Sequence, residues 1–386
     1  KGITDYDEAV EFLKTLFLFT NIAVDTEGTA LYPRDGYTLG ISLSATLETG
    51  RYITQDIVYG EVYDLMQKLF LTKRIVMHNA KYDLSMLEYH FDFKFIKDVN
   101  HPLCLEDTML MHYILDENNG HGLKELALKF SNLGNYEQAL DEFKKEYCRK
   151  NKIKQDDFTY DLIPFDTLRV YAAKDTSATI SLYDTFAPIV YKNPKLLWAY
   201  KNLLMRGSFF LGAIQEIGVP FNRDSLKVAG EELMLRYQEK REELYKYQEV
   251  HAFEAEQGTK FNPNSVMQLR VLLFDYLKLP VTGKLTGTGA NSTDAEVLEE
   301  LAALHDVPRI IMDMKKAAKL LSTYIVKAES NLNRDSRLRT NFNLHTTTSG
   351  RLSSSVKLNL QQLPRDDKTV KRCIKARPGY KIVACD

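Results

Sequence analysis

Two carboxylates stand two positions apart near the start of the chain, directly after an apolar run. Residues 22–24 are Ile-Ala-Val, Asp25 follows them, and Glu27 comes next but one. In a β-strand, alternate side chains share a face at a spacing of about 7 Å, so both carboxylates would point the same way. Such a pair repels itself unless a proton or a cation neutralises it. Taken alone, the pair fits a divalent-metal site, but it fits a strand that runs into a polar loop better.

Two further pairs of polar residues have helical spacing. Asn79 and Asp83 are four positions apart, and so are Tyr171 and Asp175, which fall inside a predicted helix over residues 168–186. Residues four apart lie on the same face of a helix. Singly, each has a structural explanation: Asn79 as a helix cap, Asp83 as a surface acid and Tyr171 as a core residue.

Together, the four acids predict a two-metal site for phosphoryl transfer. Converging carboxylates are unstable without cations, whereas two Mg²⁺ ions about 4 Å apart turn them into a reaction centre. One metal lowers the pKa of the water that attacks phosphorus, and the other stabilises the leaving 3′ oxygen. A tyrosine hydroxyl beside the fourth acid can orient that water through a hydrogen bond.

The three pairs resemble the exonuclease motifs of the DEDDy 3′→5′ exonucleases in order, spacing and predicted context. Here the motifs are Asp25-Thr-Glu27, Asn79-Ala-Lys-Tyr-Asp83 and Tyr171-Ala-Ala-Lys-Asp175, and the stretches Glu106-Asp-Thr-Met-Leu110 and His121-Gly-Leu-Lys124 between them also look familial. The resemblance covers about the first half of the chain. It implies a ribonuclease H-like α/β fold and a requirement for Mg²⁺ or Mn²⁺, with two ions at the exonuclease site.

The same resemblance implies a role for each motif residue. Asn79 would hold the substrate end, and Tyr171 would position the attacking water. The metal ligands would be Asp25, Glu27, Asp83 and Asp175, which together with Tyr171 form the catalytic set.

The elements around these motifs alternate between strand and helix. Hydrophobic periodicity predicts strands over residues 22–25, 37–44, 51–54 and 74–77 and helices over 61–70 and 168–186. This order indicates an α/β layout with a mixed sheet. Between residues 131 and 165 the chain is polar, and a charge run of this kind is usually a solvated helix or loop, so we assign it no function.

After Asn193-Pro194 the chain changes to long helices, which places the first domain at residues 1–190 and the second at 191–386. The second domain is expected to be mostly helical α+β, with helices over residues 196–217, 225–247, 295–304 and 307–328. From residue 331 to 381 the chain becomes strand-like and basic, with 12 Lys and Arg against 3 Asp.

This second half resembles the family A (DNA polymerase I-like) polymerases. The signature reads Thr346-Thr-Thr-Ser-Gly-Arg-Leu-Ser-Ser-Ser355 and then Asn359-Leu-Gln-Gln-Leu-Pro364. The thumb region of the same family resembles Phe261-Asn-Pro-Asn-Ser265, Ser292-Thr-Asp294 and Lys319-Leu-Leu-Ser-Thr-Tyr324. The last residues, Gly379-Tyr-Lys-Ile-Val-Ala-Cys-Asp386, resemble the palm strand that ends in the first catalytic aspartate. The resemblance therefore implies a partial polymerase domain in which Asp386 is a catalytic and metal-binding residue.

Sequence-neutral DNA binding suits this half of the chain. Minor-groove acceptors are present at every Watson–Crick pair, and Arg351, Asn359 and Gln361 can donate to them. Lys319 suits a phosphate contact, which sets a salt-dependent affinity, although a solvated helix face is the alternative. The thumb-like segment also implies that Thr323 contacts DNA.

Several positions depart from the family pattern. Leu358 stands where proline is common, Gln362 where asparagine is usual, and Lys315 where arginine is usual, which keeps the charge but loses bidentate geometry. A second palm aspartate and a fingers helix with its nucleotide-binding lysine are not found in the 386 residues. We therefore expect a fragment with a complete exonuclease domain and no templated synthesis by this chain alone.

Bulk properties narrow the class of protein. The chain has 386 residues, 44% of them hydrophobic and 27% charged, as in a soluble globular protein of two or three domains. Its net charge of -1 gives no indication about nucleic acid. No C-x-x-C pair occurs, which argues against a zinc ribbon and fits a reducing compartment; the four cysteines are Cys104, Cys148, Cys373 and Cys385. We found no signal peptide or membrane-spanning run and expect a cytoplasmic location in a bacterial or phage-infected cell, with an organelle left open.

We predict that the protein proofreads as part of a DNA-directed DNA polymerase, by Mg²⁺- or Mn²⁺-dependent removal of nucleotides from DNA 3′ ends. Expected partners are a DNA primer-template with a single-stranded 3′ end, a dNTP in the full-length protein, and a processivity or replisome partner, but no membrane. One alternative is a stand-alone DEDDy exonuclease acting on RNA or DNA, which has no reason to carry residues 350–354. The other is a DNA-binding module with structural acids, which would bind duplex DNA with a steep salt dependence.

Overall fold

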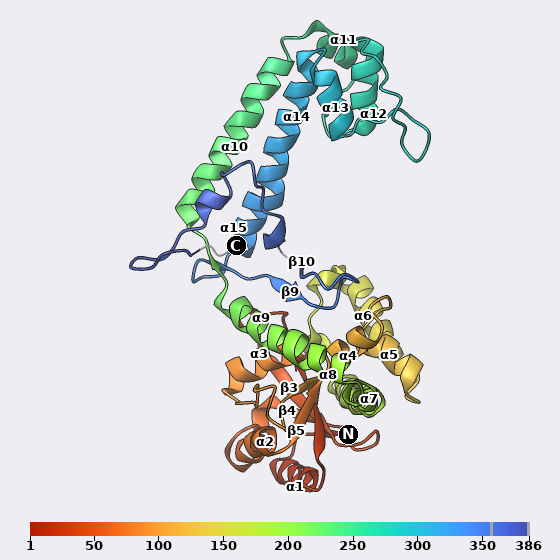
Figure 1. Cartoon of the computed structure of the whole chain (residues 1–386), viewed down its shortest axis with the longest axis vertical. Coiled ribbons are helices and arrows are strands. Elements are labelled where there is room, and N and C mark those ends of the chain that lie inside the picture. The colour runs from red at the N-terminus through yellow and green to blue at the C-terminus, as the bar shows by residue number, and fades with distance from the viewer. Residues whose placement is uncertain (356–357, 384–386) are drawn as a thin grey trace. The chain divides into compact units, whose positions relative to one another are not determined.

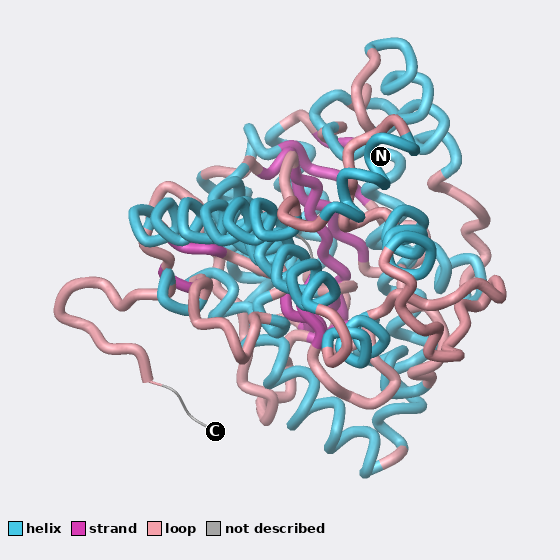
Figure 2. Tube along the Cα trace, turned by 90° about the horizontal axis from the view of Figure 1, so that it is seen from above, coloured by secondary structure: helices cyan, strands magenta, loops and turns pink. Residues whose placement is uncertain are grey.

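The computed structural model describes residues 1–355 and 358–383. The chain forms two compact units, each made of two chain segments (Figure 1). The first unit comprises Lys1–Glu216 and Phe342–Ser353, and the second comprises Ile217–Asn341 and Ser354–Asp386. Helices predominate along the trace (Figure 2). The predicted boundary between the functional domains, at residues 190 and 191, stays a prediction, because the two compact units have their boundaries at other residues.

A six-stranded mixed sheet forms the centre of the first unit. Its strand order is β1-β4-β3-β2-β5-β6, with β2 antiparallel to β3 and parallel to β5. The strands span Gly2–Ile3 (β1), Asn21–Gly28 (β2), Thr38–Ser44 (β3), Arg51–Thr54 (β4), Arg74–Met77 (β5) and Glu106–Asp107 (β6). The expected α/β layout with a mixed sheet is confirmed.

Helices cover this sheet and complete its core. They span Tyr6–Leu16 (α1), Gly60–Thr72 (α2), Ala80–Phe91 (α3), Thr108–Leu115 (α4), Leu123–Phe130 (α5), Gln138–Asn151 (α6), Phe165–Lys192 (α7), Pro194–Ala199 (α8) and Arg206–Ile217 (α9). A π-helical turn, Tyr200–Met205, joins α8 to α9, so the helix predicted over 196–217 is one run with an inserted turn. Helix α7 lies beside the sheet and contacts β2 and β3 (Figure 1).

Strand β2 is covered on both faces. Ile22, Ala23 and Val24 are each 0% exposed, although their side chains alternate between the two faces. A continuous apolar run of this kind is what a central strand between helical layers requires. The strand therefore delivers Asp25 and Glu27 to its end from a rigid, buried position.

The polar segment 131–165 is less simple than the sequence predicts. Helix α6 is a charged helix, as expected, but Leu140 and Cys148 on its inner face are buried. They join Phe158, Ile163 and other residues in a separate apolar cluster that also includes Tyr171. The segment is therefore packed against α7 instead of being solvated throughout.

Residues 342–353, from the polymerase-like half, belong to the first unit. The backbone N–H of Phe342 donates to Gln215 Oε1 at 2.8 Å, and Lys81 Nζ donates to the same oxygen at 2.8 Å and to the Phe342 carbonyl. Further along, Tyr113 Oη donates to the Thr347 carbonyl at 2.8 Å. This part of the signature segment is therefore held by the exonuclease-like unit.

The second unit is built around two long helices. Its helices span Arg223–Leu244 (α10), Gln248–Gln257 (α11), Val266–Val271 (α12), Ala295–Ala302 (α13), Asp306–Lys319 (α14) and Lys327–Asn331 (α15), with π-helical turns at Leu272–Tyr276 and Leu320–Val326. Helices α10 and α14 run side by side (Figure 1). Strand β7 (Val219–Pro220) precedes these helices and pairs with β8 (Arg337–Leu338), which follows them. Two further short strands, β9 (Asn341–Asn343) and β10 (Ser353–Ser355), lie where the chain passes between the two units.

The expected palm strand is not present in its described part. Residues 379–383 form no strand, and Ile382 and Val383 are 56% and 79% exposed. An isolated strand has no partner for its backbone hydrogen bonds, so the apolar pattern alone does not produce one here. Asp386 lies outside the described residues.

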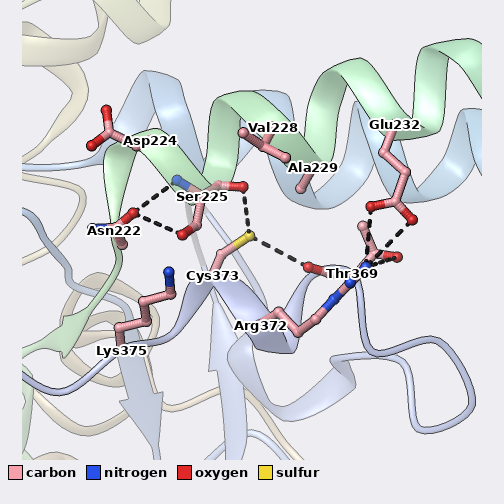
Figure 3. Close-up of a pocket in the computed structure, with 10 residues that line it drawn as sticks. All are labelled: Asn222, Asp224, Ser225, Val228, Ala229, Glu232, Thr369, Arg372, Cys373 and Lys375. Carbon is pink, nitrogen blue, oxygen red and sulfur yellow. Dashed lines mark hydrogen bonds and ion pairs between the residues drawn. The ribbon is translucent and has the colours of Figure 1, made fainter.

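The first turns of α10 hold the C-terminal segment and border a pocket of about 630 Å³ (Figure 3). Asn222 caps the helix by accepting from the backbone and hydroxyl of Ser225 at 2.8 and 2.7 Å. The buried Cys373 thiol donates to the Ser225 carbonyl at 3.4 Å, and Arg372 pairs with Glu232 at 3.1 Å. Among the described residues, those predicted from the sequence to act in catalysis or DNA binding do not line this pocket.

Within the described residues, no helix has both the length and the apolar character needed to cross a bilayer. The described cysteines, Cys104, Cys148 and Cys373, are buried thiols without disulfides.

Candidate active site

The end of β2 opens into a pocket of about 470 Å³ that contains Asp25, Glu27 and Asp175. The pairing register of β2 with β3 shifts between Glu27 and Gly28, and both residues line the pocket. A Cβ atom at Gly28 would lie 2.3 Å from Met86 Cε and 2.9 Å from Tyr82 Oη. Only glycine fits beside the second carboxylate without displacing these side chains.

Three carboxylates converge in this pocket. One oxygen from each of Asp25, Glu27 and Asp175 lies within 4.8 Å of the others. Glu27 and Asp175 are 5% and 4% exposed. Within the part of the chain that the structure describes, the buried Oε1 of Glu27 has no hydrogen-bond partner. An orphaned anionic oxygen beside two other carboxylates is the donor set that a hard divalent cation takes.

Burial makes this cluster electrostatically costly. The pKa of Asp25 is raised well above its ordinary value by burial first and then by the charges of Asp83 and Glu27. Burial and the charge of Asp175 raise the pKa of Glu27 in the same way. Ionising Asp25 and Glu27 together is therefore costly unless a cation compensates for their charges, and a cluster of this kind could bind a metal.

Asp83 has a different environment from the three convergent acids. Its Oδ1 accepts from the Thr26 backbone N–H at 2.9 Å and from the Thr26 hydroxyl at 2.7 Å. Burial raises its pKa to about 7, although both bonds to Thr26 act to lower it. The structure thus brings three of the four predicted metal ligands together. The fourth, Asp83, is hydrogen-bonded to Thr26 of β2, the strand that carries Asp25 and Glu27.

Tyr171 and Asn79 occupy contrasting positions. Tyr171 lines the pocket, and burial with the nearby charge of Asp175 raises the pKa of its phenol, so the hydroxyl keeps its proton. Asn79 precedes helix α3 as its N-cap residue in the left-handed conformation (φ 63°), and its side chain makes no capping bond. The expected shared helical face of Asn79 and Asp83 is therefore wrong, because a residue in that conformation stands outside the helix.

Two residues that the sequence did not predict also reach the acids. Lys124 Nζ and Tyr136 Oη both donate to Asp175 Oδ1, the tyrosine at 2.7 Å. Lys124 lies in the His121–Lys124 stretch that looked familial, which was the only available signal for it. Tyr136 lies in the polar segment to which no function was assigned.

The predicted DNA contacts have varied local settings. Lys319 ends α14 and is exposed, whereas Thr323 is half-buried in the π-helical turn. Arg351 is exposed, and its carbonyl accepts from the Thr347 hydroxyl at 2.6 Å. Asn359 Oδ1 accepts from the backbone N–H of Gln361, an exposed residue, at 3.0 Å.

Comparison with known families accounts for both halves of the chain. A family model described as 3'-5' exonuclease matches residues 1–191, and one described as DNA polymerase family A matches residues 231–386. The chain belongs to the family A DNA polymerases. The polymerase match favours this family over a stand-alone exonuclease, which would account for the first half only.

Full-length relatives of this family A polymerase extend well beyond it. The DNA polymerase of Escherichia phage T5 is 49% identical over 391 residues, which cover 100% of this chain and 46% of that protein. DNA polymerase I of Pseudomonas aeruginosa is 28% identical over 99% of this chain and 42% of its own length. The chain therefore spans less than half the length of these relatives.

The fold is also that of a solved polymerase. The structure of the POL domain of Pol1 from M. smegmatis, in complex with DNA primer-template and dNTP, matches with a TM-score of 0.73 and 19% identity. The match covers 99% of this chain and 59% of that one. The likeness supports the fold expected for a family A polymerase with an exonuclease domain.

Proposed function

We propose that the first unit of this family A polymerase removes nucleotides from DNA 3′ ends by metal-dependent hydrolysis. The observation that carries the proposal is the convergence of Asp25, Glu27 and Asp175 in one pocket, with oxygens within 4.8 Å of one another. The exonuclease family match over residues 1–191 supports the same activity. Mg²⁺ or Mn²⁺, in two sites, suits the all-oxygen donor set.

Each residue of the pocket has a proposed task in the hydrolysis. Asp25, Glu27 and Asp175 hold the ions, which when bound supply charge stabilisation to the phosphodiester. Asp83 fixes the end of β2 through Thr26 and is the proposed fourth ligand. The protonated Tyr171 hydroxyl donates to the attacking water and orients it. The water oxygen bonds to phosphorus, the bond from phosphorus to the 3′ oxygen breaks, and that oxygen takes up a proton.

The proposed substrate is a single-stranded DNA 3′ end, which Asn79 helps to hold. For the second half we propose primer-template binding through Lys319, Thr323, Arg351, Asn359 and Gln361, with Asp386 as the first polymerase acid. Four further expectations stay predictions. They are the need for a dNTP in the full-length protein, a processivity or replisome partner, a cytoplasmic location, and no templated synthesis by this chain alone.

The test compares digestion of a labelled primer with a frayed 3′ end by the wild type and by the Asp25→Ala plus Glu27→Ala double variant. We expect digestion to require added Mg²⁺ or Mn²⁺ and to fall about 10³-fold or more in the double variant, since removing one charge-stabilising group alone costs about 10²–10³. A matched control, Glu48→Ala plus Asp56→Ala, removes two exposed acids of the same unit and should digest normally.

Wild-type rates in the Asp25→Ala plus Glu27→Ala variant would contradict the site. An RNA primer of the same sequence tests the proposed DNA substrate, because faster removal of ribonucleotides would contradict it.

A further inference from the structure

A lysine stands among the acids of the exonuclease pocket. Lys124 Nζ donates to Asp175 Oδ1, lies 4.2 Å from the centroid of the Tyr171 ring and lies 5.0 Å from that of Tyr136. The side chains of Lys124 and Asp175 are 24% and 6% exposed. The ammonium group is thus held between two aromatic rings and a buried carboxylate, and the contact is no exposed surface ion pair.

The local helix does not explain why a lysine is found at this position. Lys124 is the second residue of α5, whose N-cap is Gly122, and Gly122 supplies no side-chain capping bond. The N-terminal end of a helix carries a partial positive charge, so a cation in its first turn is unfavourable. The acids of the pocket must therefore compensate for the position of Lys124.

The ammonium group of Lys124 supplies positive charge to the acidic cluster, as a bound metal ion would. Asp25, Glu27 and Asp175 face one another across less than 4.8 Å, and Lys124 supplies one positive charge directly to Asp175. Among the described residues, no other lysine or arginine is ion-paired to these three carboxylates. A divalent cation bound to the same carboxylates would be repelled by the lysine.

We propose that Lys124 is a built-in counter-ion that holds the acidic site assembled before divalent cations bind and that lowers their affinity for it. The inference rests on the proposed exonuclease site and assigns Lys124 a positioning role through Asp175. Tyr136, which donates to the same oxygen, keeps the carboxylate oriented when the ammonium group moves away.

The test uses the whole chain without DNA and two variants of the same residue. Lys124→Gln removes the charge, and Lys124→Arg keeps it. The matched control is Lys129→Gln on the same helix, where the lysine is exposed and lies 5.2 Å from the Phe130 ring centroid. Two quantities are measured at pH 8: the melting temperature in EDTA, and the dissociation constant of Mn²⁺ by calorimetry.

We expect Lys124→Gln to melt several degrees lower than wild type in EDTA and to bind Mn²⁺ about tenfold more tightly, since a unit charge is removed from within a few ångströms of the ion. A merely structural lysine would weaken metal binding when lost, so the direction of the change identifies the role. Lys124→Arg and Lys129→Gln should resemble wild type in both measurements.

Two results would overturn the inference. In the first, the wild type binds Mn²⁺ saturably and Lys124→Gln binds it no more tightly. In the second, Lys124→Gln and Lys129→Gln have the same melting temperature in EDTA. Failure of the proposed function gives a different result. In that case the wild type shows no saturable Mn²⁺ binding, or the Asp25→Asn variant binds Mn²⁺ as the wild type does. The melting temperature of Lys124→Gln in EDTA then decides by itself whether Lys124 is a counter-ion.

Discussion

Thr26 connects two parts of the site at the scale of single residues. It lies between Asp25 and Glu27 in β2, and both its backbone N–H and its hydroxyl donate to Asp83 on α3. Its own side chain is 4% exposed. The threonine therefore couples the strand that carries two acids to the helix that carries another.

Replacing Thr26 by valine removes one of these bonds and keeps the shape of the side chain. We expect Thr26→Val to lower the free energy of unfolding by about 1–2 kcal/mol, because a buried carboxylate loses a donor. Denaturant titration measures the change. Thr179→Val is the matched control, since the buried Thr179 hydroxyl has no hydrogen-bond partner among the described residues, and equal losses in the two variants would contradict the role of Thr26.

The buried acids also predict a pH dependence for the metal-free protein. Burial raises the pKa of Asp83 to about 7, and burial with neighbouring charges raises the pKa values of Asp25 and Glu27. These groups keep their protons to higher pH when folded than when unfolded, so the unfolded chain loses protons first as the pH rises above about 4. The stability contributed by these three acids should therefore fall between about pH 4 and pH 7, while His78 and His345, whose pKa values burial lowers, contribute with the opposite sign.

Melting temperatures in EDTA at pH 5.5 and pH 7.5 check this prediction in the wild type and in a double variant, Asp25→Asn with Asp83→Asn. The rise in pH should lower the melting temperature of the wild type relative to that of the double variant, because both proteins keep the same histidines. Adding Mg²⁺ should raise the melting temperature more at pH 7.5, because metal ions bind the deprotonated carboxylates. The same change in melting temperature between the two pH values in the wild type and in the double variant would contradict the electrostatic account.

The sequence predicted the convergent acids more successfully than their surroundings. Asp25 and Glu27 stand on one strand and Asp175 on a long helix, and the resemblance to the DEDDy exonuclease motifs joined these short-range spacings into one predicted site. Lys124 and Tyr136 reach Asp175 from distant segments of the chain. No spacing rule connects residues 39 or 51 positions apart, which is why contacts of this kind require the fold.

At the scale of elements, helix α3 carries more than an exonuclease motif. Lys81, in the middle of the Asn79–Asp83 motif, donates to Gln215 on α9 and to the Phe342 carbonyl on β9. Burial lowers its pKa to about 8. The lysine thus connects α3 to the segment 342–353, whose later residues, from Thr346 on, belong to the polymerase-like signature.

Lys81→Met keeps the length of the side chain and removes its donors. We expect faster amide hydrogen exchange in residues 342–353 and unchanged exchange in β2, because local opening follows the loss of local hydrogen bonds. Mass spectrometry of peptides from both segments measures this. Lys97→Met, which removes a lysine paired with Glu88 on the surface, serves as the control and should leave both segments unchanged. Unchanged exchange in residues 342–353 would contradict the anchoring role.

Long helices were predictable from sequence, and the tertiary role of short segments was not. The helices over 168–186 and 225–247 follow from sustained apolar periodicity, and the structure has both. Residues 379–383 have an apolar pattern too, but no described partner strand is paired with them. Strand formation depends on a neighbour, whereas a helix satisfies its own backbone.

At the scale of the whole molecule, the chain crosses between its two units more than once. The sequence indicates one domain boundary, at Asn193-Pro194, where a helix ends. In the structure, the chain passes from one compact unit to the other after residues 216, 341 and 353. Local signals such as proline report the end of an element. The assignment of residues 342–353 to the first unit depends on contacts with residues that are more than a hundred positions away, such as Gln215.

Whole-molecule charge conceals the feature that should govern DNA binding. The net charge is -1, yet residues 331–381 carry 12 Lys and Arg against 3 Asp, and the exposed Lys319 precedes them at the end of α14. Each phosphate contact contributes about 0.9 to the slope of log K against log salt. We therefore expect Lys319→Gln to make this slope less negative by about 0.9, equally for primer-templates of different sequence.

Fluorescence anisotropy between 50 and 200 mM KCl, in EDTA to prevent digestion, measures the slope for Lys319→Gln. Lys227→Gln, at an exposed position on α10, removes the same charge from the same unit and should keep the wild-type slope. The Asp25→Ala plus Glu27→Ala variant should also keep it, because the residues proposed for hydrolysis differ from those proposed for duplex binding. If Lys227→Gln and Lys319→Gln change the slope equally, net charge alone governs binding, and Lys319 makes no specific phosphate contact.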